Sequence, residues 1–360
     1  MESFATVQTK RNIGLDLFRV SLALLIFLFH SNMHFDCHYG IFDHFVRLGA
    51  IAMTGFFMLS GYALNLSNKN VLTDISEYKK FLLKRLIGII PLYYFVAIIH
   101  VLFFSSDSWQ SELLLFPIEA LGLQSFFPSL FTVSHNGGTW FISCLLPCYL
   151  LFPFIQWLFR NLSGKEKMVL GGAILSVLFI SPFVQRHFML ASIYDNPFFR
   201  ILEFSIGVLI AVLHDEEHEW MRLGIFRNKL ILLLIVALLV TGVSYGDIFF
   251  PGRDYMLMNW VVLPCLIVMF LIFRNVSFSG FDSSRLLQYL SKLSFAFFLA
   301  QFYVWTISSI VVFKILNRDA NCIRIIVSFL CCLVVSTFLH EVIEKPIKNY
   351  LIKYLIRSHA

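Results

Sequence analysis

The chain has 360 residues, of which 58% are hydrophobic and only 14% charged, and its mean hydropathy is +0.78. Soluble domains have roughly 45–50% apolar and about 25% charged residues, so the composition excludes a soluble globular fold and predicts a membrane domain. The net charge of +6 is not gathered in a soluble basic segment, so we expect the lipid bilayer as a partner and no nucleic acid.

Ten apolar stretches are long enough to cross a bilayer. In chain order they lie at 14–33, 46–66, 84–104, 139–159, 167–184, 199–214, 229–245, 257–273, 289–313 and 322–343. The segment 112–131 is also apolar, but Pro117 and Pro128 interrupt it, so we interpret it as re-entrant or interfacial. The sequence therefore predicts an all-α, polytopic membrane helix bundle with about ten transmembrane helices.

Lysine and arginine alternate from loop to loop. With the N-terminus inside, 20 of them lie on the inner side and 7 on the outer side. This asymmetry follows the positive-inside rule and predicts that both termini are cytoplasmic. We expect a cytoplasmic segment at 1–13, a transmembrane domain at 14–343 and a basic cytoplasmic tail at 344–360, with Pro346 ending the last helix at Glu344 and Lys345.

The first predicted helix contains two ionisable residues, Arg19 and His30. Their separation of 11 residues is about 20° more than three full turns, so both side chains lie on one face, roughly 16 Å apart along the axis. Ionisable groups inside a span are costly and are candidates for function. Histidine is a general base near neutral pH, and arginine binds phosphate or carboxylate. The alternative is that Arg19 reaches the inner headgroups and His30 marks the outer interface.

Histidines recur after this position. His30, His34 and His38 have the i, i+4, i+8 spacing of a metal-binding helix face. No clear set of acidic or thiolate ligands accompanies them, so we interpret this stretch as a solvated outer loop and expect no metal.

Later spans contain further candidates. Arg200 and Glu203 lie at i, i+3 and can pair, either as a structural ion pair or as a wall of a substrate site near the outer face. Trp140 can stack on a sugar or anchor its helix at the interface. Lys84 and Arg85 lie at the start of the third span, where basic residues anchor a helix end at the inner surface.

Six motifs in order resemble the acyltransferase-3 family, multi-pass O-acyltransferases that modify bacterial surface polysaccharides and related acceptors. They are GLDLFR with ten residues between Arg19 and His30, GFFMLSGYAL at 55–64, KRLIGIIPLYY at 84–94, TWFISCLLPCYLLFP at 139–153, FFRILEFSIG at 198–207 and HEVIEKPIKNYL at 340–351. The resemblance covers nearly the whole chain. Three positions depart from the family pattern: Gly88 replaces a frequent arginine, Leu145 a frequent glutamate and Gln301 a frequent histidine.

The resemblance implies a membrane O-acyltransferase in a bacterial inner (plasma) membrane. It would move an acyl group, most often acetyl, from cytoplasmic acyl-CoA to a hydroxyl of a cell-surface polysaccharide, a lipid-linked sugar or a similar acceptor. Acyl-CoA is then a donor substrate, and no bound cofactor is expected. Arg19, assisted by Lys84 and Arg85, would hold the donor phosphates. His30 would deprotonate the acceptor or carry the acyl group itself.

The chain ends soon after its last span, so we expect a stand-alone enzyme without an outer esterase-like domain. A transporter or flippase for a polysaccharide precursor or a small anion is the competing interpretation. It explains the helices and the buried charges equally well, but it predicts inverted halves with matching broken helices, which the sequence does not contain.

Overall fold

The computed structural model describes residues 12–68, 74–105, 108–127, 139–188, 192–218, 221, 223–250, 257–275 and 285–356, and every element within these ranges is helical. The longer helices are α1 (Ile13–Phe35), α3 (Ala52–Ser67), α4 (Ile75–Ile87), α5 (Ile90–Phe103), α6 (Trp109–Ala120), α7 (Trp140–Asn161), α8 (Gly164–His187), α9 (Pro197–Asp215), α10 (Lys229–Ser244), α13 (Leu263–Asn275), α14 (Arg285–Ser309) and α15 (Asn321–Phe338). Shorter pieces are η1 (Gly40–Phe42), α2 (Asp43–Arg47), η2 (Gly49–Ile51), η3 (Gln124–Phe126), η7 (Gly224–Arg227), α11 (Gly246–Phe249), η8 (Met258–Val262), η9 (Ile310–Ile315), η10 (Leu339–Glu344), α16 (Lys345–Leu351) and η11 (Ile352–Ile356).

Eight helices in the described ranges are long and apolar enough to cross a membrane. The predicted span 289–313 coincides with a helix pair bent by 68°, and the predicted span 229–245 coincides with α10, an apolar helix of 16 residues. Helix α6 has 12 residues, too few to cross, as expected for an interfacial or re-entrant segment. The prediction of an all-α polytopic bundle is confirmed.

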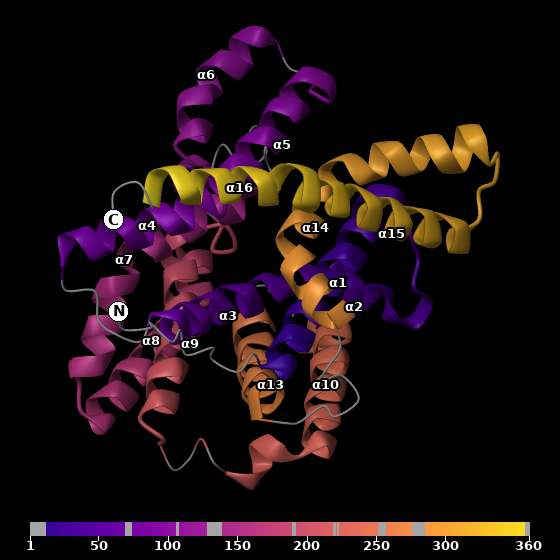
Figure 1. The fold of residues 1–360 in the computed structure, drawn as a ribbon. Coiled ribbons are helices and arrows are strands. Elements are labelled where there is room, and N and C mark those ends of the chain that lie inside the picture. Colours follow the sequence, from indigo (N-terminus) through magenta and orange to yellow (C-terminus); the bar gives the residue numbers. More distant parts are fainter. Residues whose placement is uncertain are drawn as a thin grey trace.

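Helices α3 and α9 lie at the centre of the bundle, with α1, α7 and α13 around them (Figure 1). Their apolar stretches are each 72% buried, against 22% for the helix that begins with α15. A β-carbon built on Gly61 of α3 would lie 2.1 Å from the carbonyl oxygen of Phe204, and one on Gly207 of α9 would lie 1.9 Å from that of Met58. Two glycines therefore let these two backbones touch, as small residues do in membrane helix pairs.

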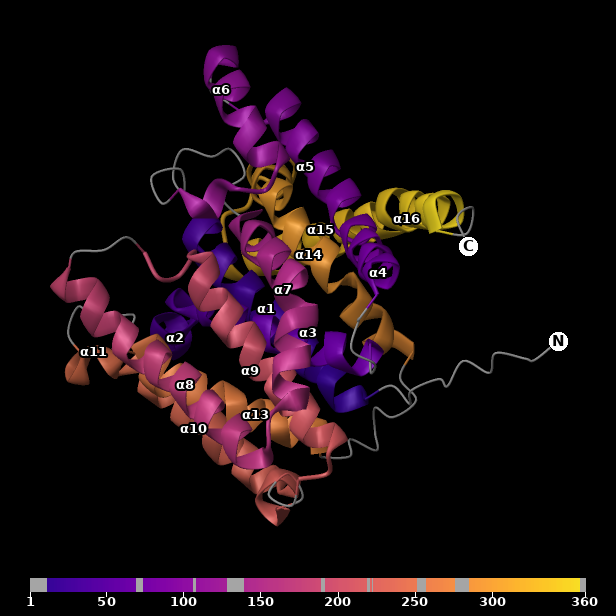
Figure 2. The ribbon, with the colours of Figure 1, turned by 90° about the vertical axis from the view of Figure 1, so that its left-hand side faces the viewer.

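The outer helices turn apolar side chains away from the bundle. In Figure 2, α8, α10 and α13 lie side by side along one flank, while α5 and α6 project from another. The exposed side of α10 is formed by Leu230, Leu233, Leu234 and Leu238, and that of α15 by Ile326, Leu330 and Val334. These residues recur every three or four positions, so each helix has one continuous apolar face directed at lipid.

Helix ends that the alternating topology assigns to one side of the membrane meet in the structure. On the predicted inner side, the Asn12 side chain donates to the carbonyl oxygen of Arg274 at 2.8 Å, and Arg160 pairs with Asp215 at 3.3 Å. Asn12 also caps α1 by accepting from the backbone of Leu15.

The predicted outer side shows the same agreement. The Asn321 amide donates to the carbonyl oxygen of His38 at 2.7 Å, and Arg324 pairs with Asp36 at 3.3 Å. The loop after the first span therefore meets the start of the last one, as an even number of crossings between them requires.

One prediction about the last helix is wrong. Helical structure does not end at Glu344 and Lys345 but continues from Asn321 to Leu355, through Pro346. Proline lacks an N–H, and here it occupies the first turn of α16, directly after the π turn η10. A wider π turn changes the hydrogen-bond register, so the missing donor and the proline ring are accommodated without ending the helix.

Candidate functional site

Helix α1 places Arg19 and His30 on one continuous rod of 23 residues. Both side chains are half-buried. Arg19 lines a cavity in the half of the bundle where the inner helix ends gather, while His30 lies about three turns further along α1.

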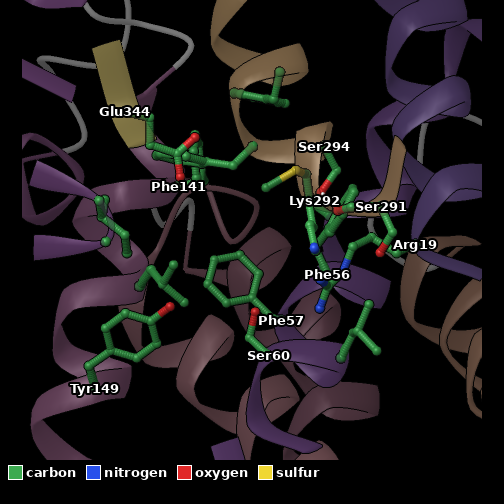
Figure 3. A pocket seen from close by; sticks show the side chains of 17 residues that line it. Arg19, Phe56, Phe57, Ser60, Phe141, Tyr149, Ser291, Lys292, Ser294 and Glu344 are labelled. Atoms are coloured by element: carbon green, nitrogen blue, oxygen red, sulfur yellow. Dashed lines mark hydrogen bonds between the residues drawn. The ribbon is translucent and has the colours of Figure 1, made fainter. Parts of the chain in front are cut away.

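The cavity has a volume of about 240 Å³ and is formed by residues from α1, α3, α7, α14 and η10. Figure 3 shows the side chains that line it. Its polar lining residues are Arg19, Ser60, Tyr149, Ser291, Lys292, Ser294 and Glu344, and its apolar wall includes Phe56, Phe57, Phe141, Leu145, Phe295 and Phe298. Gly88 and Ile89, at the junction of α4 and α5, complete the lining. A space with hydroxyls and cations on one side and aromatic rings on the other suits a ligand that has an anionic and an apolar part.

Two cations approach this cavity from different helices. Figure 3 shows the side chains of Arg19 and Lys292 pointing toward one another, with Ser291 and Ser294 next to Lys292. The Ser291 hydroxyl donates to the carboxylate of Asp16 at 2.5 Å, one turn before Arg19 on α1. Glu344, the acidic residue of the lining, accepts from Nδ1 of His340 at 2.7 Å.

His30 is held by one side chain from α14. Its Nδ1 lies 2.7 Å from Oε1 of Gln301, and the Gln301 Nε2 donates to the carbonyl oxygen of Phe297 at 3.3 Å. A carbonyl only accepts, so this partner fixes which end of the amide faces His30. The amide oxygen must then accept from Nδ1–H, which leaves the Nε2 of His30 with a lone pair and able to take a proton.

Phe298 connects His30 to the cavity. Its ring lines the cavity, lies 5.9 Å from the His30 imidazole and packs edge-on against Phe141 at 4.6 Å. Arg19 at the cavity and His30 beyond its aromatic wall therefore share one face of α1, as their spacing predicts.

The other two histidines of the predicted outer loop lie in different surroundings. His34 stays on α1, with its ring 5.6 Å from that of His30. His34 stacks on Trp305 at 6.0 Å, with the two rings 29° apart. Helix α1 ends at Phe35, so His38 leaves the helical face and lies between the carboxylates of Asp36 and Asp43. Across the described ranges, no three His, Cys, Asp or Glu side chains are grouped as ligands for a metal ion.

Arg200 and Glu203 form the predicted pair, with Arg200 NH1 2.6 Å from Glu203 Oε2. Thr54 joins them, since its hydroxyl donates to Glu203 at 2.9 Å and accepts from Arg200 at 3.2 Å. The guanidinium of Arg200 also lies against the rings of Phe57, Trp140 and Tyr194, at 5.4, 5.3 and 4.9 Å from their centroids. Arg200, Glu203 and Trp140 are all buried, and Phe57 joins this cluster to the cavity wall.

Lys84 and Arg85 lie next to the cavity and outside its lining. Lys84 is exposed, and Arg85 donates to the Ser67 hydroxyl at 3.2 Å and covers the Phe81 ring. Of the three cations predicted to hold the donor phosphates, Arg19 alone lines the cavity.

Three contributions to the site are absent from the sequence-based prediction. Lys292 was counted only as an inner-side charge, Gln301 only as a departure from a pattern, and Glu344 only as a helix end. Lys292 and Gln301 lie on α14, more than 250 residues after the end of α1, and Glu344 lies later still. Lys292 and Gln301 are nine residues apart, and this spacing does not predict that both side chains face α1.

The amino-acid sequence is similar to those of known acyltransferases. A family model described as an acyltransferase domain matches residues 12–341. The acyltransferase MdmB of Streptomyces mycarofaciens is 25% identical over 288 residues, which cover 72% of this chain and 69% of that protein. No solved structure matches. The similarity favours an enzyme over a transporter or flippase.

Proposed function

Because this chain belongs to the acyltransferase-3 family of multi-pass membrane acyltransferases, we propose that it moves an acyl group from cytoplasmic acyl-CoA to a hydroxyl on an extracytoplasmic acceptor. Acetyl-CoA is the proposed donor. A cell-surface polysaccharide, a lipid-linked sugar or a similar molecule is the proposed acceptor. The proposed location is the inner (plasma) membrane of a bacterium, with both termini in the cytoplasm.

The observation that supports this proposal most strongly is that α1 holds a group that can bind an anion, Arg19, and a group that can act as a base, His30, on one face. Arg19 lines a cavity at the predicted inner side, and His30 presents an unprotonated nitrogen further out. The phosphates of a CoA thioester would lie at Arg19, and its flexible arm would extend past Phe298 so that the thioester reaches His30. Lys84 and Arg85 would attract the anionic donor to this end of the bundle.

The proposed reaction at His30 needs only the donor, the acceptor and the imidazole. Nε2 of His30 takes the proton of the acceptor hydroxyl while the hydroxyl oxygen attacks the thioester carbonyl. The carbon–sulfur bond then breaks, and the departing CoA thiolate receives that proton from the imidazolium. The products are an ester and free CoA. The hydrogen bond to Gln301 holds the imidazole in the tautomer that this sequence requires.

Arg200, Glu203 and Trp140 are proposed to support the acceptor side. The ion pair between Arg200 and Glu203 and the contact of the guanidinium with the Trp140 ring hold these side chains against one another, which favours a rigid wall behind Phe57 over a direct part in the reaction. Breaking a buried pair by removing one partner costs about 3–5 kcal/mol. Substitutions in this cluster are therefore expected to reduce the amount of folded protein as well as activity.

The first prediction tests His30. His30→Ala should abolish acyl transfer without lowering the amount of folded protein, since general-base catalysis contributes about 10²–10⁴ in rate. Surface glycans from deletion cells that carry wild-type protein, His30→Ala or no enzyme would be compared by mass spectrometry for the acetyl ester. His34→Ala is the matched control, because His34 lies on α1 one turn after His30, stacks on Trp305 of α14 and has no proposed chemical role. Near-normal esterification by His30→Ala would reject the catalytic assignment.

A further inference from the structure

Lys292 is a cation of the cavity to which the proposed mechanism gives no role. It is exposed, it lines the cavity, and it forms no ion pair with a carboxylate in the part of the chain that the structure describes. Its side chain points toward Arg19, which comes from a different helix (Figure 3). Two cations on one cavity repel each other, and an anion bound between them would be attracted to both.

The neighbours of Lys292 favour an anion with several acceptor oxygens. Hydroxyl groups of Ser60, Ser291 and Ser294 line the same space. Glu344 is the acidic lining residue. Its Oε2 accepts from His340, and within the described residues no ion pair joins it to Lys292. Arginine and lysine donors together with hydroxyls are the groups that proteins use to hold phosphate.

We propose that Lys292 and Arg19 form a two-cation phosphate site that binds the phosphates of the CoA donor. This inference rests on the proposed function, and it adds a residue from α14 to a site otherwise assigned to α1. Lys292 would fix the nucleotide end of the donor, while the apolar wall of Phe298 and Phe141 would accommodate the arm.

The test measures binding of CoA to the purified full-length protein by calorimetry. Lys292→Met removes the charge and keeps the length of the side chain, so CoA should bind roughly ten- to a hundredfold more weakly. Lys79→Met is the control, because Lys79 is an exposed lysine on the same predicted side and does not line the cavity. Pantetheine, which lacks the phosphates, should bind equally to wild type and to both variants.

An arginine in place of Gly88 could replace the positive charge that Lys292→Met removes. Gly88 lines the same cavity with a helical φ of −75°, and a β-carbon there would meet only carbonyls of its own turn, at 3.3 and 3.5 Å. Gly88→Arg added to Lys292→Met should therefore restore part of the CoA affinity without changing pantetheine binding.

The possible outcomes distinguish a failure of the proposed function from a failure of the phosphate site alone. Wild-type protein that does not bind CoA would overturn both the proposed function and the phosphate site. Wild-type protein that binds CoA, with Lys292→Met binding equally well, would overturn only the role of Lys292. A loss of pantetheine binding in Lys292→Met would also reject it, because a phosphate site cannot affect a ligand without phosphates.

Discussion

Among single side chains, Gln301 determines most about the chemistry of His30. It is buried, it accepts from Nδ1 at 2.7 Å, and its own amide is oriented by the Phe297 carbonyl. Partners of this kind fix the tautomer and the direction of a functional imidazole. On the proposed mechanism, Gln301 is a positioning residue, and its effect on the reaction would pass through His30.

The second prediction follows from this contact. Gln301→Ala should lower acyl transfer about 10- to 100-fold at unchanged protein level, because the imidazole loses its orienting acceptor. Gln301→Glu should keep an acceptor but add a carboxylate that favours protonated imidazole. Its activity should consequently begin to fall at a higher pH than that of the wild type as the medium is acidified. Superimposable pH–rate profiles for Gln301→Glu and wild type would show that Gln301 has only a packing role.

Residue patterns predicted the local part of the site and not the long-range part. The spacing of Arg19 and His30 and the pairing of Arg200 with Glu203 follow from helix geometry alone, and the structure agrees with both. Gln301 and Lys292 reach the site only because α14 packs against α1. Hydropathy and spacing contain no information on which distant helix will be a neighbour.

At the level of helices, a close backbone contact between α3 and α9 positions part of the site. Phe57 and Ser60 on α3 line the cavity, and Arg200 and Glu203 on α9 support its wall. Gly207 allows this packing, because its missing side chain leaves room for the backbone of Met58.

The third prediction concerns this glycine. Gly207→Ala would place a β-carbon 1.9 Å from the Met58 carbonyl oxygen, so the helices must separate. We expect destabilisation of about 1–3 kcal/mol and a lower thermal unfolding midpoint in detergent. Gly172→Ala in α8 is the control, since nothing lies within 4 Å of the added atom and alanine favours helix. Equal midpoints for the two variants would contradict the proposed close contact.

Helix positions were predictable from hydropathy, because lipid requires long apolar stretches. The end of the last helix was not, because the rule that proline disfavours helix at the preceding residue assumes a regular α-helical turn. At Pro346 this assumption does not hold, because the turn before it, η10, is a π turn. Such a turn depends on packing around the whole segment and leaves no simple mark in the sequence.

For the molecule as a whole, contacts between helix ends agree with an alternating topology. Asn12 meets Arg274 on one side, and His38 meets Asn321 on the other. These contacts fix which ends lie together, and the positive-inside rule assigns the first group to the cytoplasm.

The fourth prediction tests that assignment with native cysteines. Cys322 is exposed at the predicted outer side, whereas Cys37 nearby is fully buried. Burial also raises the pKa of the Cys37 thiol to about 11, so at pH 7.4 it has almost no reactive thiolate. A membrane-impermeant maleimide should label spheroplasts at Cys322, and Cys322→Ser should remove the label. Labelling that requires permeabilised membranes would reverse the predicted orientation.

The unbroken course of α1 has a consequence for donor choice. Backbone hydrogen bonds hold Arg19 and His30 at a fixed interval of about 16 Å, and one inserted residue between them would turn His30 by about 100°. On the proposed mechanism, a donor must therefore match this interval with the arm between its phosphates and its thioester. The size of the acyl group plays no part in that match. On this mechanism the enzyme would recognise its donor by the carrier, and discrimination among acyl groups would fall to the residues beyond His30.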